Sequence, residues 1–320
     1  MPPRVVITET LDARCAAWLS QRADVVWARY DEPAAMAEHL PAADALVVRT
    51  YTQVDADLLD RAPKLKVVGR AGVVLENVDL AACRERGIRV VYTPDANTQA
   101  VVEYVLALML DELRPRYTLE GPVDSHTFHA LRKDQVGVQL DELTLGILGF
   151  GRIGKRLGAV ASALGMTLLV NDLLPEADLR AQVGYDFQFV DKHTLFADSD
   201  ILTIHVDGRA SNRHLVHSDL LFQLRPGCLL INAARGMLVD PAALAAWARS
   251  DAVKQHGGKA VLDVHDPEPP DHHYPLFGLP NVRLLPHLAS RTDTAMRNMS
   301  WVVKDVMTVL EGNEPRDAAV

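Results

Sequence analysis

The chain has 320 residues, of which 48% are hydrophobic and 23% charged, as is typical of globular proteins. This length favours two domains over one core. The net charge of −9 argues against a nucleic-acid partner, because binding phosphates requires a basic surface.

Cysteine usage points to a reducing compartment, and hydropathy argues against a membrane protein. The three cysteines, Cys15, Cys83 and Cys228, are isolated and form no C-x-x-C pair, which favours neither disulfides nor a zinc site. No apolar run approaches the length of a membrane span, and the first residues lead directly into a strand-like run without a signal peptide. We therefore expect a cytoplasmic protein that binds neither membranes nor nucleic acid, with no metal site.

Short β-branched runs alternate with helical stretches over the first 97 residues. The runs cover residues 5–7, 25–27, 45–49, 65–69 and 88–92. Such alternation predicts a parallel sheet with helices on both faces, and hence a complete α/β domain.

A long apolar helix is expected at residues 101–110, after a turn signal at residues 93–97. The helix is apolar on nearly all sides, so we expect it to be buried by more than its own sheet. A subunit interface is the partner that we expect, in a homodimer. Residues 114–141 are polar and show no periodicity.

A glycine-rich turn follows at residues 149–154, Gly-Phe-Gly-Arg-Ile-Gly. An apolar run at residues 145–148 precedes it, and helical spacing from Ile153 to Leu164 follows. Gly165 ends this helix, and a second strand at residues 168–170 leads to Asp172. The order strand, glycine turn, helix, strand and acid is typical of a dinucleotide-binding unit.

Each glycine of this turn has a physical role. Gly149 makes the tight turn, Gly151 lets the backbone approach a pyrophosphate, and Gly154 lets the helix pack on the strand. The phosphates then meet free amide groups at the positive end of the helix dipole. Asp172 can bind both ribose hydroxyls and would repel a 2′-phosphate, so we expect NAD rather than NADP.

Further strands are expected at residues 187–190, 201–205, 228–232, 260–264 and 282–285, with a final helix at residues 294–310. The predicted fold class is α/β with two domains. A Rossmann-type NAD-binding domain at residues 98–289 is inserted into a flavodoxin-like substrate domain, formed by residues 1–97 and 290–320.

Three short stretches at predicted strand ends carry the candidate catalytic residues. Arg235 lies in the loop after one strand, Glu268 in a proline-flanked loop, and His287 follows Pro286. Singly, these residues are explained as well by a surface ion pair, a solvated acid and one of twelve histidines. Together they supply a carboxylate clamp, a proton donor and an acid that tunes it.

These motifs resemble the D-isomer-specific 2-hydroxyacid dehydrogenases, which include phosphoglycerate, glyoxylate/hydroxypyruvate and D-lactate dehydrogenases. The resemblance rests on residues 69–73, 93–110 with Glu103, 149–172, 232–240, 263–269 and 286–287, and on the whole domain that precedes the glycine turn.

The resemblance implies an NAD-dependent enzyme that interconverts a D-2-hydroxy acid and its 2-oxo acid. It implies that His287 is the acid/base, that Glu268 pairs with it, and that Arg235 binds the substrate. It also implies that Asp263 holds the nicotinamide carboxamide. Further contacts implied for the cofactor are at Gly149, Gly151, Arg152, Ile153, Gly154, Asp172, His205, Ala233, Ala234 and His287, and for the substrate at Arg49, Ala71, Gly72 and Val73.

The chain departs from the family pattern in three places. Val74-Leu75-Glu76 replaces the usual Gly-Val-Asp beside the expected carboxylate grip, and Asp207-Gly208-Arg209 replaces the usual Pro-Leu-Thr over the cofactor. Residues 251–258 resemble an insertion. The chain stops at Val320, so we expect no C-terminal regulatory domain of the kind that some phosphoglycerate dehydrogenases carry.

Several alternatives stay open at this point. The same fold serves phosphite and formate dehydrogenases, although the formate group pairs its histidine with Gln and this chain has Glu268. An NAD-sensing corepressor keeps the same three residues. The histidine-rich stretch 265–273 is interpreted as a solvated loop rather than a metal site, and Tyr51 fits a substrate contact and a strand end equally well. Which 2-hydroxy acid is used depends on the shape of the pocket.

Overall fold

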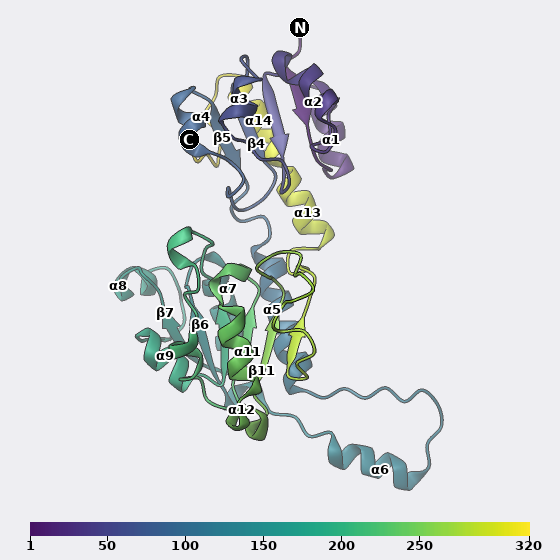
Figure 1. The fold of residues 1–320 in the computed structure, drawn as a ribbon, viewed down its shortest axis with the longest axis vertical. Helices are drawn as coiled ribbons and strands as arrows, with labels where there is room; N and C mark the ends of the chain where they lie inside the picture. Colours follow the sequence, from purple (N-terminus) through teal and green to yellow (C-terminus); the bar gives the residue numbers. More distant parts are fainter. The chain divides into compact units, whose positions relative to one another are not determined.

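The computed structural model describes all 320 residues, and the chain divides into two compact units. One unit is Met1–Ala100 with Ser290–Val320, and the other is Val101–Ala289. The division comes three residues after the expected boundary at residue 97 and coincides with the one at 289/290. Each unit holds a parallel sheet with helices, so the expected α/β class is confirmed (Figure 1).

The sheet of the first unit has five parallel strands in the order β2-β1-β3-β4-β5. This is the flavodoxin-like order, in which the chain reverses direction across the sheet between the first and third strands. The strands are β1 (Arg4–Ile7), β2 (Asp24–Trp27), β3 (Ala45–Val48), β4 (Val67–Arg70) and β5 (Arg89–Tyr92).

Both faces of this sheet are covered, as expected of parallel strands. Side chains alternate along β1, so Val5 and Ile7 lie in one core cluster and Val6 lies in the other. The helices of this unit are α1 (Ala13–Ser20), α2 (Pro33–His39), α3 (Ala56–Asp60), α4 (Leu80–Glu85), α13 (Asp293–Ser300) and α14 (Val302–Leu310), with a 3-10 turn at Leu40–Ala42.

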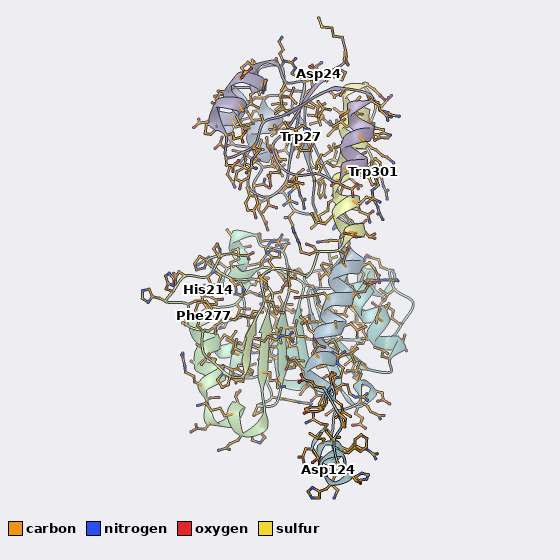
Figure 2. The ribbon with its side chains drawn as sticks, turned by 90° about the vertical axis from the view of Figure 1, so that its right-hand side faces the viewer. Asp24, Trp27, Asp124, His214, Phe277 and Trp301 are labelled. Carbon is orange, nitrogen blue, oxygen red and sulfur yellow. The ribbon has the colours of Figure 1, made fainter.

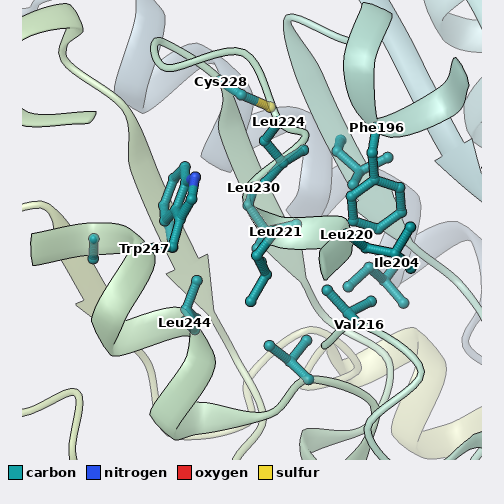
Figure 3. Packing of buried hydrophobic residues seen from close by; sticks show 14 of the residues in the cluster. Phe196, Ile204, Val216, Leu220, Leu221, Leu224, Cys228, Leu230, Leu244 and Trp247 are labelled. Atoms are coloured by element: carbon teal, nitrogen blue, oxygen red, sulfur yellow. The ribbon is translucent and has the colours of Figure 1, made fainter. Parts of the chain in front are cut away.

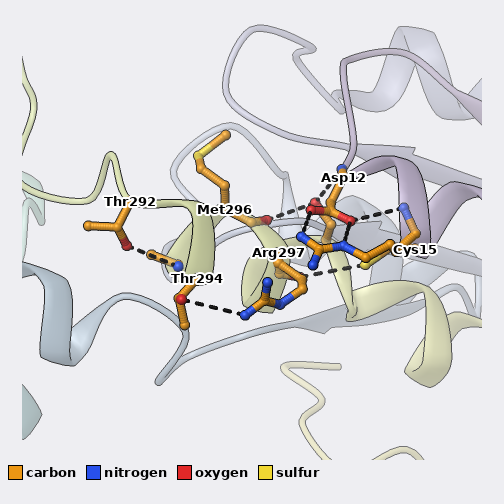
Figure 4. A network of polar contacts seen from close by, with 9 residues as sticks. Asp12, Cys15, Thr292, Thr294, Met296 and Arg297 are labelled. Atoms are coloured by element: carbon orange, nitrogen blue, oxygen red, sulfur yellow. Dashed lines mark hydrogen bonds and ion pairs between the residues drawn. The ribbon is translucent and has the colours of Figure 1, made fainter.

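The C-terminal helices complete the first unit. A Cβ on Gly69 would lie 2.4 Å from Val306, so this glycine allows α14 to pack closely on β4. The Asp12 amide donates to Ser300 Oγ at 3.0 Å, and the Cys15 thiol donates to the Arg297 carbonyl (Figure 4). The prediction of a single helix at residues 294–310 was wrong, because the segment is divided at Trp301 into α13 and α14 (Figure 1).

The sheet of the second unit has seven parallel strands in the order β12-β11-β10-β9-β6-β7-β8. Its first strand, β6, lies between β7 and β9, so the chain changes direction there, as in a Rossmann fold. The strands are β6 (Thr144–Leu148), β7 (Thr167–Asn171), β8 (Gln188–Phe189), β9 (Ile201–Ile204), β10 (Leu229–Asn232), β11 (Lys259–Leu262) and β12 (Val282–Leu284).

Helices cover this sheet on both faces. On one face, Trp247 and Phe196 pack with Leu230 and Ile204 of the strands (Figure 3). The helices are α5 (Thr98–Leu113, which begins in the first unit), α6 (Ser125–Asp134), α7 (Arg152–Ala163), α8 (Glu176–Arg180), α9 (Lys192–Asp198), α10 (Ser218–Leu221), α11 (Pro241–Arg249) and α12 (Asp251–His256). Short 3-10 turns occur at Leu140–Glu142, Ala210–Asn212 and Gly236–Leu238.

Residues 114–139 form an arm that leaves the second unit and returns to it. The arm contains α6, in which no residue is buried, and Asp124 at its start lies far from the sheet (Figures 1 and 2). The Val138 amide donates to the Leu113 carbonyl at 3.1 Å and closes the base of the arm. This helix was not expected, because its residues are mostly polar and lack apolar periodicity. None of the helices in the chain is both long and apolar enough to span a membrane.

Candidate active site

The glycine turn between β6 and α7 has the local geometry that its sequence predicts. Gly149 has φ +91°, and a Cβ there would lie 2.8 Å from the His205 backbone. A Cβ on Gly154 would lie 2.4 Å from the Gly149 carbonyl, so only glycine allows this approach. A Cβ on Gly151 would meet nothing within 4 Å. The backbone at Gly151 is therefore open to a ligand, at the amino end of α7, where amide groups favour a pyrophosphate.

Asp172 follows β7 directly and also braces the turn. One carboxylate oxygen accepts the Phe150 amide at 2.6 Å, and the other accepts the Leu174 amide at 2.9 Å. The side chain is only partly buried. Asp172 therefore fixes the glycine turn, and part of its side chain stays accessible at the strand end where a ribose is expected.

His205 follows β9, next to the glycine turn. Its Nε2 lies 3.0 Å from Thr203 Oγ1, and its Nδ1 is buried without a hydrogen-bond partner in the protein. Burial lowers the pKa of His205 to about 4, so the ring is neutral. In the unusual loop that follows, Asp207 accepts the Arg209 amide at 3.3 Å and Asn212 Nδ2 at 3.0 Å. This carboxylate gives the loop an internal scaffold.

His287 and Glu268 form the central pair of the second unit. His287 Nδ1 lies 2.5 Å from Glu268 Oε1, and the two side chains are 44% and 40% exposed. The hydrogen bond to Glu268 raises the pKa of His287, while burial acts in the opposite direction. Burial also acts to raise the pKa of Glu268, but the hydrogen bond from His287 lowers it overall. The pair is accessible to solvent, and Nε2 of the imidazole is left for another partner.

Asp263 holds the loop that carries His287. Its carboxylate is fully buried and accepts the Leu288 and Ala289 amides, each at 2.8 Å, and the Tyr104 hydroxyl at 3.2 Å. His287 itself has φ +56°, a left-handed conformation that is uncommon for a residue with a Cβ. The expected contact of Asp263 with the nicotinamide stays a prediction; in this structure its buried carboxylate supports the His287 loop.

His265 connects the three loops that carry Arg235, Glu268 and His287. Its amide donates to Glu268 Oε2 at 3.3 Å, and its Nε2 lies 2.8 Å from the Leu285 carbonyl, two residues before His287. Since a carbonyl only accepts, Nε2 carries the proton. A Cβ on Gly236 would lie 1.9 Å from the His265 carbonyl, so the loop of Arg235 packs against the same residue.

Arg235 lies in the loop that follows β10. The Asn232 side chain accepts the Ala234 amide at 3.1 Å and donates to the Arg235 carbonyl at 2.9 Å, which fixes the backbone. The positive charge of Arg235 opposes the rise in the pKa of His287, so the two groups influence each other. The structure thus brings Arg235, Glu268 and His287 together at the carboxyl edge of one sheet.

The expected substrate contacts of the first unit lie at the carboxyl edge of its own sheet. Gly72 accepts the Thr93 amide at 3.1 Å and the Thr93 hydroxyl at 3.2 Å. Ala71 is buried and its amide donates to Val48, while Val73 is partly exposed. Arg49 is partly buried and donates to the Thr10 carbonyl at 3.1 Å. These residues form one edge of the unit.

The model of the D-isomer specific 2-hydroxyacid dehydrogenase NAD binding domain matches residues 106–289, more than half of the chain. The chain belongs to the D-isomer specific 2-hydroxyacid dehydrogenases. The expected family and the NAD cofactor are confirmed, and the cofactor fits the open backbone at Gly151.

Similar proteins in this dehydrogenase family carry different substrate names. The chain is 35% identical to D-3-phosphoglycerate dehydrogenase of Mycobacterium leprae over 99% of its own length and 58% of that protein. It is 35% identical to (S)-sulfolactate dehydrogenase of Chromohalobacter salexigens over 94% of its own length and 96% of that protein. The crystal structure of the TT0316 protein of Thermus thermophilus superposes with a TM-score of 0.83 at 31% identity, covering 99% of this chain and 100% of that one. The chain spans little more than half the length of the phosphoglycerate dehydrogenases that it matches.

Four residues that support loops of the two units were given no such role from the sequence, and His265, which was expected in a solvated loop, is buried. Tyr104 and His265 support the His287 loop, while Glu9 and Asn77 hold a loop in the first unit. Glu9 had a usable signal, since it stands two residues after a buried strand, near the strand end where parallel sheets place their functional residues. The other three depend on contacts distant in sequence.

Proposed function

We propose that the protein is an NAD-dependent oxidoreductase that interconverts a D-2-hydroxy acid and its 2-oxo acid. The observation that carries this proposal is the 2.5 Å contact between His287 and Glu268 beside Arg235, in the same unit as the glycine turn. A proton donor, a fixed cation and a dinucleotide turn together suit transfer of a hydride and a proton to a carbonyl.

In this proposal His287 and Arg235 act on the carbonyl of the 2-oxo acid. When bound, NADH supplies the hydride that C2 accepts. Nε2 of protonated His287 donates its proton to the carbonyl oxygen, so that the C–O double bond becomes an alcohol. Glu268 accepts from Nδ1, fixes the tautomer and stabilises the charged ring. Arg235 binds the substrate carboxylate and stabilises negative charge that develops on the oxygen.

The test is NADH oxidation with a panel of 2-oxo acids. The panel contains glyoxylate, hydroxypyruvate, pyruvate and longer homologues, together with the 2-oxo acids of phosphoglycerate and sulfolactate, which the similar proteins' names suggest. We expect turnover with at least one member. Absence of turnover with all of them, alongside normal NADH binding, would refute the 2-oxo acid reductase. Reduction of NAD+ by phosphite or formate would then favour those dehydrogenases of the same fold, and no reduction by either would support an NAD-sensing role.

Replacement of Asp172 by asparagine should weaken the preference for NADH over NADPH. Asparagine keeps one acceptor oxygen for the turn and the shape of the side chain. It removes the negative charge that opposes a 2′-phosphate. We expect the ratio of the two dissociation constants, measured by calorimetry, to change by about tenfold, as loss of one close charge repulsion implies. Asp178→Asn, an exposed acid on α8, is the control. An unchanged ratio in Asp172→Asn would contradict this account of specificity.

We also propose a homodimer, with the arm at residues 114–139 as its contact surface. We favour the arm over the expected interface at helix 101–110, because Val101, Val102, Val105, Leu108 and Met109 are already buried in the core of their own unit. In contrast, α6 has ten residues and no buried side chain, and isolated helices shorter than about 12–15 residues are marginal in water. A second copy would cover the exposed Tyr117, Leu119, Phe128, Val136 and Val138.

Sedimentation velocity tests this surface. Phe128→Asp should shift the protein from dimer to monomer, because it places a charge in an apolar contact. Phe222→Asp is a matched control, since Phe222 is similarly exposed but lies outside the arm. A wild-type monomer, or an unaffected Phe128→Asp dimer, would contradict the arm as the interface.

A further inference from the structure

The carboxylate of Glu9 accepts hydrogen bonds from every backbone amide of one short loop of the first unit, residues 49–52. Glu9 is 9% exposed and lies two residues after the end of β1. Oε1 accepts the Arg49, Tyr51 and Thr52 amides at 3.0, 3.1 and 3.1 Å, and Oε2 accepts the Thr50 amide at 2.9 Å. The Thr52 hydroxyl adds a further bond to Oε1 at 3.0 Å. Four successive amides therefore point at one carboxylate.

The same loop is held from its other side by Asn77. The Asn77 side-chain amide donates to the Arg49 carbonyl at 3.0 Å and to the Thr52 carbonyl at 2.7 Å. Asn77 is 8% exposed and ends the segment that begins with Ala71 and Gly72. Glu9 thus accepts hydrogen bonds from the amides of the 49–52 loop, and Asn77 donates to the carbonyls at both ends of this loop.

Successive amides that converge on one point form a nest, an arrangement that proteins use to bind anions. Here the nest is filled by the protein's own carboxylate. Burial acts to raise the pKa of Glu9, but the hydrogen bonds from the Thr52, Thr50, Arg49 and Tyr51 amides lower it overall. The acid is therefore ionised at neutral pH, and its charge is stabilised by the loop.

We propose that Glu9 is a positioning residue that holds the 49–52 loop, and with it Arg49, in the conformation that binds the anionic substrate. This inference rests on the proposed function, in which Arg49 contacts the 2-oxo acid. Without Glu9, four amides lose their shared acceptor, so the loop samples other conformations and the Arg49 guanidinium is not pre-organised. Binding of the substrate weakens, whereas NADH, which binds the second unit, is unaffected.

The test compares Glu9→Ala, Glu9→Gln and Glu38→Gln, an exposed acid of the same unit, with the wild type. We expect Glu9→Ala to raise the KM for the preferred 2-oxo acid by about tenfold or more, as loss of charge-assisted hydrogen bonds implies, with a smaller change in kcat. Glu9→Gln, which loses one acceptor position only, should lie between. Acetate, at concentrations that leave the wild type unaffected, should lower the KM of Glu9→Ala by filling the vacated nest. Glu38→Gln should match the wild type.

Amide hydrogen exchange supplies a readout that does not depend on turnover. The 49–52 amides should exchange faster in Glu9→Ala, while the core strands of both units remain protected. A wild-type KM in Glu9→Ala, or equal loss of protection throughout the first unit, would overturn the positioning role. If the wild type turns over no 2-oxo acid, the proposed function fails. Exchange at residues 49–52 then still decides whether Glu9 holds the loop, because unchanged exchange there would overturn it.

Discussion

Replacement of His287 by asparagine is expected to lower kcat for 2-oxo acid reduction by about 10²–10⁴-fold, the usual contribution of a general acid. The choice of asparagine follows from the backbone. His287 has φ +56°, a conformation that asparagine tolerates better than alanine, so the loop between Asp263 and Ala289 should stay in place. Asparagine cannot exchange a proton near neutral pH, and the carbonyl oxygen therefore loses its donor.

The dissociation constant for NADH, measured by fluorescence, should remain within about twofold, because the glycine turn and Asp172 are unchanged. His272→Ala, an exposed histidine in the neighbouring loop, is the matched control and should keep the wild-type kcat. His287→Ala should be as inactive as His287→Asn and less stable, since alanine adds the strain of a positive φ. A wild-type kcat in His287→Asn would remove His287 from the chemistry.

The parts of the molecule that the sequence predicted are those specified by local patterns. Gly149 requires a positive φ, Gly154 requires close packing, and Asp172 follows a strand; each constraint acts within a short stretch of chain. The β-branched runs likewise became parallel strands, because both faces of such strands are buried and every residue can be apolar.

The parts that were missed either depend on contacts between distant segments or, like α6, make few contacts with the rest of their unit. The strand-end position of Glu9 was visible in the sequence, but the loop that it binds lies forty residues away and is brought to it by the pairing of β1 with β3. The support that Asp263 and Tyr104 give to the His287 loop was not expected either, because it joins segments far apart in the sequence. Helix α6 was missed because its ten residues are mostly polar and its own unit buries none of their side chains.

The Glu268–His287 pair makes a second large effect testable through pH. Glu268→Gln is nearly isosteric and keeps an acceptor oxygen for Nδ1, but it removes the charge that favours the imidazolium. We expect kcat for reduction at neutral pH to fall by about 10²-fold, the lower end for loss of acid catalysis. Asp271→Asn, an exposed acid in the same loop, should match the wild type.

The direction of the pH effect follows from the raised pKa of His287. Reduction needs the protonated ring, so kcat/KM should be full at low pH and fall as the pH rises through the raised pKa. Oxidation of the 2-hydroxy acid needs the neutral ring and should rise over the same interval. Without the Glu268 charge the ring loses its proton more readily, so both transitions should move to lower pH in Glu268→Gln. Reduction by this variant should therefore recover partly in acid, where the ring is protonated again. Unmoved transitions would mean that Glu268 does not set the protonation of His287, and a shift to higher pH would mean that its charge is not what raises that pKa.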